Sequence, residues 1–358
     1  MSSLLELYQH HRGKVSDKWS LYLSEYDRRL APYRDQPVRL LEIGIQNGGS
    51  LEIWAAYFPK AEKIVGCDIN PACANLTYDD PRIAVVVGDA NSDDAQERIL
   101  SHSSSFDLVI DDGSHTSGDI VRSFSRYFPK VTSGGTYIAE DLHCSYWESH
   151  EGGLYHPHSS IAFFKSLVDV LNREHWGVDL SASQFLAGFQ HTASASLSEE
   201  MLGQIHSIEF FNSGCSVGKS TNVNDGLGPR FIAGNTEDVM PGHLRLNGER
   251  LASPDQSANA WAVMSASPAE QYRDLRQSLA DKEAALSQIE RELASLRGER
   301  KNLRSALAET DAAVANLTVA LRERDHEIAA IRQTLLWKLA HPMGTLRAWR
   351  ATRSESNR

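Results

Sequence analysis

The sequence predicts a doubly wound α/β fold of Rossmann-like topology, followed by a long α-helical coiled coil. Over the first 150 residues, short apolar runs of strand length alternate with stretches of helical spacing. Continuous apolar runs are typical of strands buried on both faces, and βαβ alternation predicts a mostly parallel sheet. Beyond residue 267 a seven-residue repeat replaces this pattern. We expect the following divisions: an N-terminal helical segment (1–36), an α/β domain (37–265), a coiled coil (267–336) and a basic tryptophan-containing tail (337–358).

The elements follow from the pattern in chain order. A leading segment, 14–34, has helical spacing and is expected to pack on the sheet. Near the end of the domain, an antiparallel strand pair is expected around Asn212-Ser213-Gly214, and 219–260 is expected to form loop. The expected parallel strands are 38–45, 63–69, 83–89, 106–113 and 134–142. The expected helices are 49–58, 92–101, 118–130 and 160–174.

The coiled-coil prediction depends on a repeat that keeps its phase. Ser267, Pro268 and Glu270 form a capping-box start. Apolar residues then recur at alternating spacings of four and three from Leu275 to Leu335, with Lys282, Arg300 and Arg324 interrupting the seam. A helix folding back on its own domain is the alternative, but this stretch would span roughly 90 Å. We therefore expect a homo-oligomer, although the leucine-rich seam does not select its stoichiometry.

Composition excludes several classes of protein. The net charge of −11 argues against a nucleic-acid binder, and no apolar run is long enough to span a membrane. The four cysteines form no CxxC pair, and the N-terminus lacks a secretory signal, so a cytoplasmic location is expected. The tail carries Trp337 and Trp349 among basic residues. Both peripheral contact with an anionic membrane and a solvated chain end are compatible with it.

A glycine-containing turn and three acids suggest a nucleoside cofactor without a phosphate clamp. Gly44 and Gly48 follow the first strand, but the dinucleotide-binding fingerprint GxGxxG is incomplete. Glu42 would repel a pyrophosphate and suits a cationic ligand, and Asp68, at the end of the second strand, can accept bonds from ribose hydroxyls. Asp89 ends the third strand, beside the expected adenine position. Each acid alone is commonly a turn residue; together they favour S-adenosylmethionine.

A second group of acids predicts a metal. Asp111, Asp112 and His115 lie in the sequence DDGSH after one buried strand, and Glu140 and Asp141 follow the next. The carboxyl ends of neighbouring parallel strands open into one crevice, where unpaired carboxylates would repel each other. Mg²⁺ would relieve that repulsion, and His115 could act as a general base. The alternative is that these acids cap a helix and begin a loop.

These residues resemble a known family. The stretch is similar to class I S-adenosylmethionine-dependent methyltransferases, in the metal-dependent sugar O-methyltransferase group near the mycinamicin and macrocin enzymes and the cephalosporin-hydroxylase-like proteins. The resemblance covers about residues 15–150 well and 150–265 weakly. The matching pieces are SDKWSLYLSEY (16–26), LLEIGIQNGGSLEIW (40–54), GCDI (66–69), GDANS (88–92), VIDDGSH (109–115), YFPKVTSGGTYIAEDL (127–142) and SYW (145–147).

The resemblance implies a role for each site residue. Asp112, Glu140 and Asp141 would ligate Mg²⁺, and His115 would be the base. Two adjacent sugar hydroxyls would bind the metal, which lowers the hydroxyl pKa, and the oxyanion would attack the methyl carbon. Tyr146 and Trp147 could stack on the sugar or belong to the core. The implied cofactor site comprises Glu42, Gly44, Gly48, Asp68, Asp89 and Asp111.

Several functions stay open at this stage. The coil and basic tail favour a cell-surface polysaccharide or glycolipid precursor as acceptor over a small glycosylated natural product. A catechol-like acceptor offers the same pair of adjacent oxygens. A non-catalytic scaffold that uses the coil would not need the acid cluster, and a Rossmann dehydrogenase would need the missing GxGxxG.

Overall fold

The computed structural model describes residues 2–221, 226–262, 268–334 and 339–340. The chain divides near Arg273 and Asp274 into two units, the α/β unit and the unit that holds most of the long helix, and each is described by itself. Among the described residues, none of the helices is long and apolar enough to cross a membrane.

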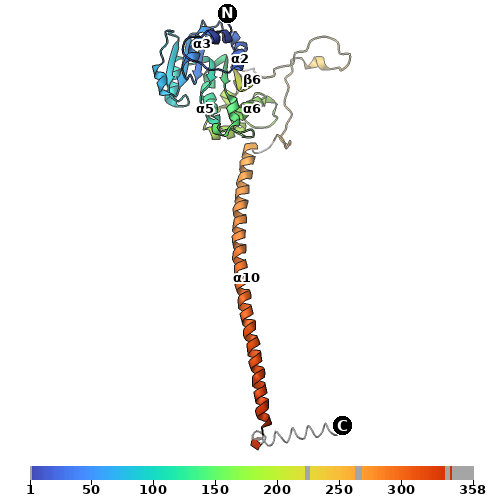
Figure 1. Ribbon diagram of the computed structural model, residues 1–358. Helices are drawn as coiled ribbons and strands as arrows, with labels where there is room; N and C mark the ends of the chain where they lie inside the picture. Colours follow the sequence, from blue (N-terminus) through green and yellow to red (C-terminus); the bar gives the residue numbers. More distant parts are fainter. Residues whose placement is uncertain (1, 222–225, 263–267, 335–338, 341–358) are drawn as a thin grey trace. The chain divides into compact units, whose positions relative to one another are not determined.

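The α/β unit is built on one seven-stranded sheet, which confirms the predicted fold class (Figure 1). The strand order is β3-β2-β1-β4-β5-β7-β6, with parallel pairing from β3 to β5 and antiparallel pairing of β7 with both β5 and β6. The strands are β1 (Arg39–Ile43), β2 (Lys63–Asp68), β3 (Ile83–Val87), β4 (Phe106–Asp111), β5 (Val131–Ala139), β6 (Ile205–Phe211) and β7 (Gly214–Lys219).

The register of the central strands brings the predicted acids to one edge. Ile43 pairs with Asp111 across β1 and β4, and Asp111 pairs with Ala139 across β4 and β5. The three central strands therefore end level with one another. The DDGSH and Glu140-Asp141 segments leave the sheet side by side, as parallel strands require.

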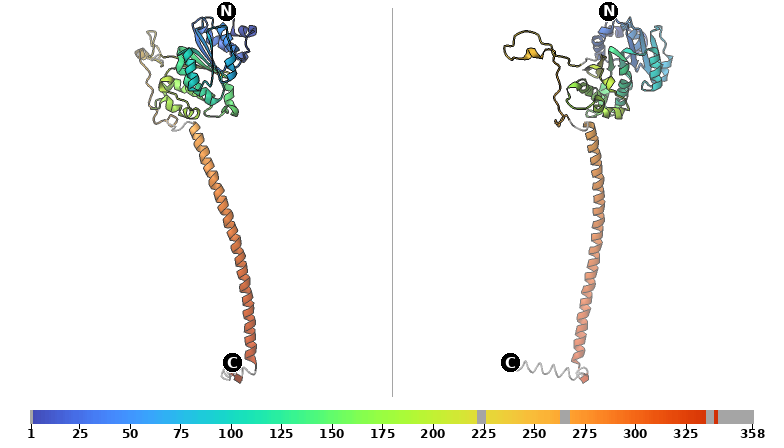
Figure 2. Two further views of the ribbon diagram at one scale, coloured as in Figure 1. Left: turned by 90° about the vertical axis from the view of Figure 1, so that its left-hand side faces the viewer. Right: turned by 180° about the vertical axis from the view of Figure 1, so that it is seen from behind.

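Helices cover both faces of the sheet, and each face has its own apolar core (Figure 2). One core includes Phe124 from α5 and Phe163 from α6, packed on Val109 of the sheet. The other includes Tyr26 from α2 and Trp54 from α3, packed on Leu40. The helices of the unit are α1 (Leu4–His10), α2 (Ser20–Leu30), α3 (Gly49–Tyr57), α4 (Asp93–His102), α5 (Ser117–Tyr127), α6 (Ser160–Leu171), α7 (Ala182–Phe185), α8 (Ala187–Ala193) and α9 (Glu199–Leu202).

The leading segment differs from the prediction at its start. The helix expected over 14–34 is α2, which begins only at Ser20, and residues 14–19 form an irregular segment. Tyr22, Tyr26 and Leu30 are buried as expected, whereas Trp19 is 60% exposed. The irregular segment crosses the carboxyl edge of the sheet, where residues 15–19 line the main cleft.

The remaining elements agree with their predictions in kind. The β6–β7 pair turns at Asn212 and Ser213, as expected. Apart from a 3₁₀ turn at His243–Leu246 and an isolated bridge between Pro229 and Arg250, the described part of 219–260 beyond β7 has no regular secondary structure.

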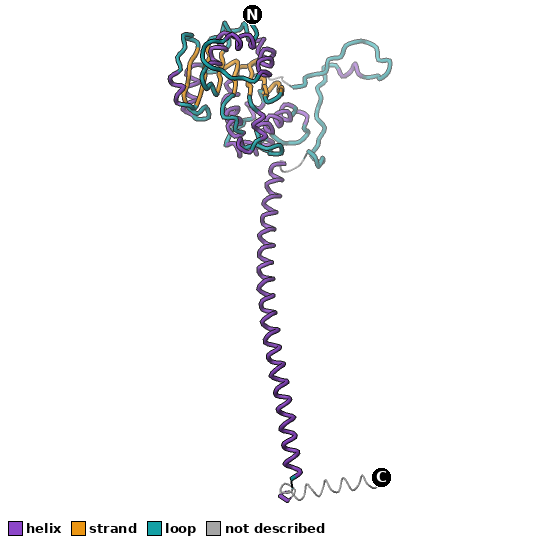
Figure 3. Tube along the Cα trace, in the orientation of Figure 1, coloured by secondary structure: helices purple, strands orange, loops and turns teal. Residues whose placement is uncertain are grey.

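The predicted coil region forms one unbroken helix, α10 (Pro268–Gln333) (Figure 3). The expected N-cap Ser267, the seam residue Leu335 and the tail residues Trp337 and Trp349 lie outside the described residues. The helix is therefore confirmed, and its pairing with another helix stays a prediction.

Candidate functional site

Two adjoining clefts open at the carboxyl edge of the sheet. The larger, about 400 Å³, lies over the ends of β1, β4 and β5. The smaller, about 170 Å³, lies between the ends of β2, β3 and β4. Gly44, Asp68 and Gly113 line both clefts and mark the boundary between them. A ligand with a nucleoside part and a second polar part could therefore occupy both.

The turn after β1 forms the wall between the two clefts. Gly44 has φ +85°, and a Cβ there would stand 2.0 Å from the backbone oxygen of Asp112. Only glycine fits so close an approach of two chain segments. Asp68 Oδ2 accepts hydrogen bonds from the backbone N–H groups of Ile45 and Gln46, at 3.0 and 2.8 Å. The predicted ribose-binding acid thus also holds the turn in place.

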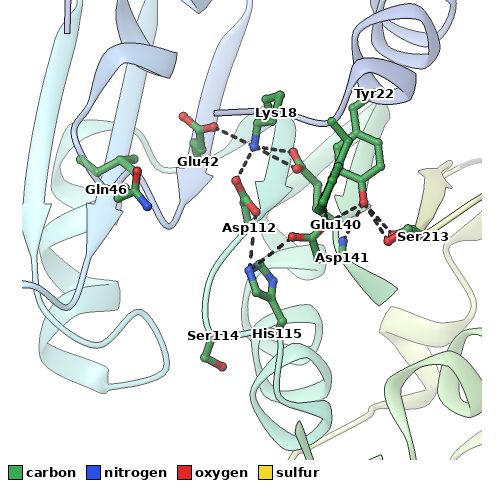
Figure 4. Close-up of polar contacts among 12 residues, drawn as sticks. Lys18, Tyr22, Glu42, Gln46, Asp112, Ser114, His115, Glu140, Asp141 and Ser213 are labelled. Carbon is green, nitrogen blue, oxygen red and sulfur yellow. Dashed lines mark hydrogen bonds and ion pairs between the residues drawn. The ribbon is translucent and has the colours of Figure 1, made fainter. Parts of the chain in front are cut away.

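Lys18 lies at the centre of the acid cluster (Figure 4). Its ammonium group donates to Asp112 and lies 2.8 and 2.9 Å from the two carboxylate oxygens of Glu140. A third carboxylate, that of Glu42, is 3.8 Å away. The Lys18 side chain is only 3% exposed. This side chain is a cation that sequence reasoning assigned no role.

The charges of this cluster do not balance. Burial alone would lower the pKa of Lys18, but Glu140, Asp112 and Glu42 together raise that pKa well above its ordinary value, so the ammonium stays charged. Burial also raises the pKa of Glu140, to about 8, even though Lys18 opposes the shift. Tyr26 donates to the same carboxyl group at 2.5 Å. The Lys18 ammonium is shared by three carboxyl groups, of which those of Glu42 and Glu140 are buried and that of Asp112 is 20% exposed. A further cation in the cluster would favour the ionised form of Glu140.

Glu42 is the most deeply placed of the predicted cofactor residues in this cleft. It is 1% exposed, and Ser50 donates to its Oε2 at 2.6 Å. Its Oε1 has no hydrogen-bond partner among the described residues. Burial raises the pKa of Glu42, and Lys18 opposes that shift. A buried oxygen without a donor is able to accept a bond from a ligand cation.

A second group of ligand atoms lies beside the lysine. One ligand atom each from Asp112, His115 and Asp141 lies within 4.8 Å of the others, the spacing expected around a metal ion. His115 Nε2 is 3.6 Å from Asp141 Oδ2 and 3.9 Å from Asp112 Oδ1. Burial lowers the pKa of His115, which favours the neutral imidazole that can accept a proton or bind a metal.

Residues of the N-terminal segment fix the position of Asp141. Trp19 Nε1 donates to Asp141 Oδ1 at 3.1 Å, and the backbone N–H of Asp141 donates to the Tyr22 hydroxyl at 3.0 Å. The same hydroxyl is 2.9 Å from Ser213 Oγ in the β6–β7 turn. The predicted metal acid is therefore held by two elements that sequence reasoning did not connect with it.

The predicted metal acids separate into two environments. Asp112 and Asp141 face His115, whereas the Glu140 side chain points to Lys18 (Figure 4). Glu140 also accepts the hydrogen bond from Tyr26. Glu140 lies outside the group of ligand atoms around His115. The structure thus brings Asp112, Asp141 and His115 together and places Glu140 behind them.

The other predicted cofactor residues lie at or near the smaller cleft. Asp89 and Asp111 line it, and Asp111 is buried, with a hydrogen bond from the Tyr137 hydroxyl at 2.6 Å. Burial raises the pKa of Asp111 to about 6. Gly48 lines neither cleft. It is the N-cap residue of α3, with φ +78°, and its backbone oxygen accepts a hydrogen bond from the Tyr78 hydroxyl at 3.0 Å.

An exposed group of aromatic side chains adjoins Asp141. The rings of Trp19 and His143 meet edge to face at 6.1 Å between centroids, and those of His143 and Trp147 at 5.0 Å. Trp19 and Trp147 are at least half exposed, and Tyr146 is 45% exposed. The interpretation of Tyr146 and Trp147 as core residues is therefore wrong. The interpretation that they stack on a sugar stays a prediction.

Comparisons with known proteins agree with the predicted resemblance. Residues 41–142 match a family described as a methyltransferase domain. A rhamnosyl tetracenomycin-C 2′-O-methyltransferase from Streptomyces olivaceus is 38% identical over 172 residues, 45% of this chain and 44% of that protein. The mycinamicin VI 2″-O-methyltransferase of Micromonospora griseorubida is 36% identical over 173 residues, 45% of this chain and 42% of that protein. The chain thus matches less than half the length of these relatives.

A solved structure is similar in fold as well as in sequence. It is a methyltransferase from the mycinamycin biosynthetic pathway, in complex with Mg, S-adenosylhomocysteine (SAH) and mycinamycin VI. It is 29% identical, with a TM-score of 0.51, over 62% of this chain and 54% of that one. The predicted resemblance to S-adenosylmethionine-dependent sugar O-methyltransferases is therefore confirmed.

Proposed function

We propose that the chain is an S-adenosylmethionine-dependent, Mg²⁺-dependent O-methyltransferase that acts on a sugar hydroxyl. The observation that carries this proposal is the junction of two clefts at Gly44 and Gly113. On one side lie acids suited to a nucleoside, and on the other an acid cluster with excess negative charge. The relatives named above are O-methyltransferases, one of them of a rhamnosyl compound, and the similar solved structure holds Mg and SAH, which agrees with both halves of the site.

The cofactor would extend across both clefts. Its nucleoside would lie in the smaller one, with Asp68 near the ribose and Asp89 and Asp111 near the base. Its amino acid part and sulfonium would lie in the larger one, where Glu42 offers a carboxylate oxygen that accepts no hydrogen bond from the described residues. The buried acids Glu42 and Asp111 suit a cationic cofactor, whereas they would repel a pyrophosphate.

The donor set fits a divalent cation. Asp112 and Asp141 supply hard oxygen ligands, and Glu140 would join them if Lys18 moved away from it. When bound, Mg²⁺ supplies a lowered pKa to a coordinated hydroxyl group. His115 is placed to accept that proton, because it lies between the two carboxylates and burial keeps its imidazole neutral. Trp19 and Trp147 would offer apolar faces to the sugar ring beside Asp141.

Two acceptor classes have support of different kinds. One relative is named for a rhamnosyl tetracenomycin-C and the other for mycinamicin VI, which favours a glycosylated natural product. Helix α10 is the only described feature that favours a cell-surface polysaccharide or glycolipid precursor, since the basic tail lies outside the described residues. The natural-product acceptor fits at least as well and is the first to test.

Calorimetric titration tests the proposed activity at its first step. We expect the full chain to bind S-adenosylmethionine with EDTA present, and to bind Mg²⁺ in a separate titration. Asp112→Asn should weaken Mg²⁺ binding at least tenfold, since a hard cation loses a charged ligand. Asp94→Asn is the matched control, because Asp94 is 79% exposed and pairs with Arg98 of its own helix. Absence of cofactor binding in every condition would refute the enzyme and leave the scaffold alternative.

An acceptor screen tests the second step. Labelled methyl transfer should be measured to a rhamnosylated polyketide, to a rhamnose-containing polysaccharide and to a catechol, each with Mg²⁺ and with EDTA. We expect transfer to a sugar acceptor only with Mg²⁺. Transfer to the catechol alone would overturn the sugar assignment while leaving the metal-dependent chemistry in place.

A further inference from the structure

Helix α10 presents its large hydrophobic side chains along one stripe. The stripe runs through both seam positions of the heptad, and its members are 42–71% exposed. Among the described side chains of the helix, Val319 is the one large exposed hydrophobic residue off this stripe. The stripe consists of Leu275, Leu279, Leu286, Ile289, Leu293, Leu296, Leu303, Leu307, Val314, Leu317, Leu321, Ile328 and Ile331.

A stripe of this period requires another helix. A strict seven-residue repeat keeps its seam facing a supercoiled partner, and most helical stability comes from packing an apolar face. The helix α10 itself carries the same repeat over the same length, so a second copy of this chain is the partner that matches in every heptad. The positions that flank the seam then determine the orientation of that copy.

We propose that α10 forms a parallel, in-register, two-stranded coiled coil with α10 of a second copy of this chain. In that arrangement two flanking positions face each other across the seam. The residue just before Leu293 (position g), like its equivalents in the other heptads, faces the partner's residue with a number higher by five (position e). Among these flanking pairings, every one in which both residues are charged joins opposite charges within the described part of the helix. The charged pairs are Glu292 with the partner's Arg297, Glu299 with the partner's Arg304, and Glu327 with the partner's Arg332.

The basic residues on the seam fit the same arrangement. Seam position d comprises Leu275 and every seventh residue after it, and seam position a comprises Leu279 and every seventh residue after it. In a parallel coil, a side chain at position d packs beside the residue that follows the same position in the partner. A side chain at position a packs beside the residue that precedes the same position in the partner. Each seam cation has an acid at that place, and Arg324 also donates to Glu327 of its own chain at 3.2 Å. The pairs are Lys282 with the partner's Glu283, Arg300 with the partner's Glu299, and Arg324 with the partner's Asp325.

The antiparallel alternative brings like charges together. Its longest overlap places Leu275 opposite Ile328 of the other helix. Flanking positions of the same type then face each other. Two of the three charged pairings are like-charged, each twice by symmetry: Arg297 with Arg304 and Glu290 with Asp311, whereas Arg276 with Asp325 is opposite. Like charges at that separation destabilise a coil by about as much as opposite charges stabilise it.

The seam cations also favour two strands over more. In register, each of Lys282, Arg300 and Arg324 meets its own copy in one layer of the seam. A dimer has one like-charge pair in such a layer, whereas a trimer has three and a tetramer six. A two-stranded seam also leaves these side chains closer to solvent and to the flanking acids, where the charge is less costly.

Disulfide cross-linking of the full chain tests the orientation. The four native cysteines are all buried, so the unsubstituted chain is the control without cross-links. Leu296→Cys should cross-link to its own copy under mild oxidation, because residue 296 meets itself in the parallel coil. In the antiparallel alternative, residue 296 would face residue 307. A mixture of the Leu296→Cys and Leu307→Cys chains that gives only mixed dimers would therefore overturn the parallel arrangement.

Charge reversal tests the flanking pairs and the stoichiometry. Glu292→Arg with Glu299→Arg, and separately Arg297→Glu with Arg304→Glu, should each raise the dissociation constant on the order of a hundredfold, since four attractive pairs become repulsive. Mixing the two variants should restore most of the association, because every flanking pair is again opposite in charge and only one of the two Arg300 side chains then faces the substituted position 299. Sedimentation that shows a monomer or a trimer of the native chain at micromolar concentration would overturn the proposal, as would two variants that associate normally alone.

Discussion

Replacing Lys18 by methionine should destabilise the protein strongly when no metal is present. The change removes a 3% exposed ammonium group that contacts Asp112, Glu140 and Glu42, and it leaves the buried carboxyl groups of Glu42 and Glu140 without their cation. Removal of one partner from a buried ion cluster costs about 3–5 kcal/mol. Because total stability is commonly only about 5–15 kcal/mol, the melting temperature should fall by many degrees.

Mg²⁺ should reverse part of that loss. A divalent cation bound by Asp112 and Asp141 would replace the lost positive charge, and it would no longer be repelled by the Lys18 ammonium. We therefore expect Lys18→Met to bind Mg²⁺ at least about tenfold more tightly than the native chain. A ligand at 100 times its dissociation constant stabilises the folded state by about 2.7 kcal/mol. At equal Mg²⁺ concentration, the tighter-binding variant should therefore be stabilised more than the native chain.

Urea unfolding in EDTA and in Mg²⁺ measures both effects, and Lys14→Met provides the control. Lys14 is the neighbouring lysine of the same segment; it is 27% exposed and pairs with Glu52 at 2.7 Å. A surface pair of this kind contributes about 0–1 kcal/mol and has no connection with the acid cluster. If Lys18→Met were as stable as Lys14→Met in EDTA, or if Mg²⁺ stabilised the two variants equally, the ion cluster inferred around Lys18 would be wrong.

Two further predictions concern the turn after β1 and the opposite end of the sheet. Gly44→Ala should abolish cofactor binding, because the added Cβ would stand 2.0 Å from the backbone oxygen of Asp112. Gly134→Ala is the control, because Gly134 has nearly the same φ of +84° but open space where the Cβ would lie. That variant should lose only about 1–2 kcal/mol of stability and should bind the cofactor normally in calorimetry. Asp107→Asn should lose stability above about pH 4 and little below it. Burial would raise the pKa of Asp107, but the hydrogen bonds from Arg39 outweigh burial and lower that pKa. The contribution of Asp107 to stability is therefore present above the pKa of the unfolded chain and is lost as the pH falls through the pKa of the folded chain. Urea midpoints of the native chain and the variant that differ by the same amount from pH 3 to 7 would contradict this.

The strands and their acids were predictable because the signals are local. A buried parallel strand such as Phe106–Asp111 shows as a continuous apolar run, and a polar residue at its end marks the carboxyl edge of the sheet. Once the strands are parallel and neighbouring, the convergence of Asp112 and Asp141 follows from topology alone. The separation of Glu140 from these two does not follow, because consecutive residues leave a strand end in different directions.

Lys18 could not be found in this way, because its partners are distant in sequence. Its contacts join residue 18 to residues 42, 112 and 140, and no spacing rule relates them. The one signal was chemical: several carboxylates crowded at one sheet edge require compensation, and a lysine lies in SDKWSLYLSEY, a segment that the resemblance already included. Its helical spacing predicted a helix from residue 14, whereas Lys18 lies in the irregular segment that precedes α2 at Ser20.

The backbone gives an independent reason to assign function to this edge. Of the six described non-glycine residues with positive φ, Gln46, His115 and Asp141 all line the larger cleft, one after each of β1, β4 and β5. Such conformations cost on the order of 1–3 kcal/mol each and persist only where the surroundings enforce them. Here Asp68 holds the N–H of Gln46, and the Tyr22 hydroxyl holds that of Asp141. Glycine would adopt these conformations at no such cost, so a sheet edge that only turned the chain would carry glycine at these positions. The presence of Gln46, His115 and Asp141 instead indicates that their side chains are needed there.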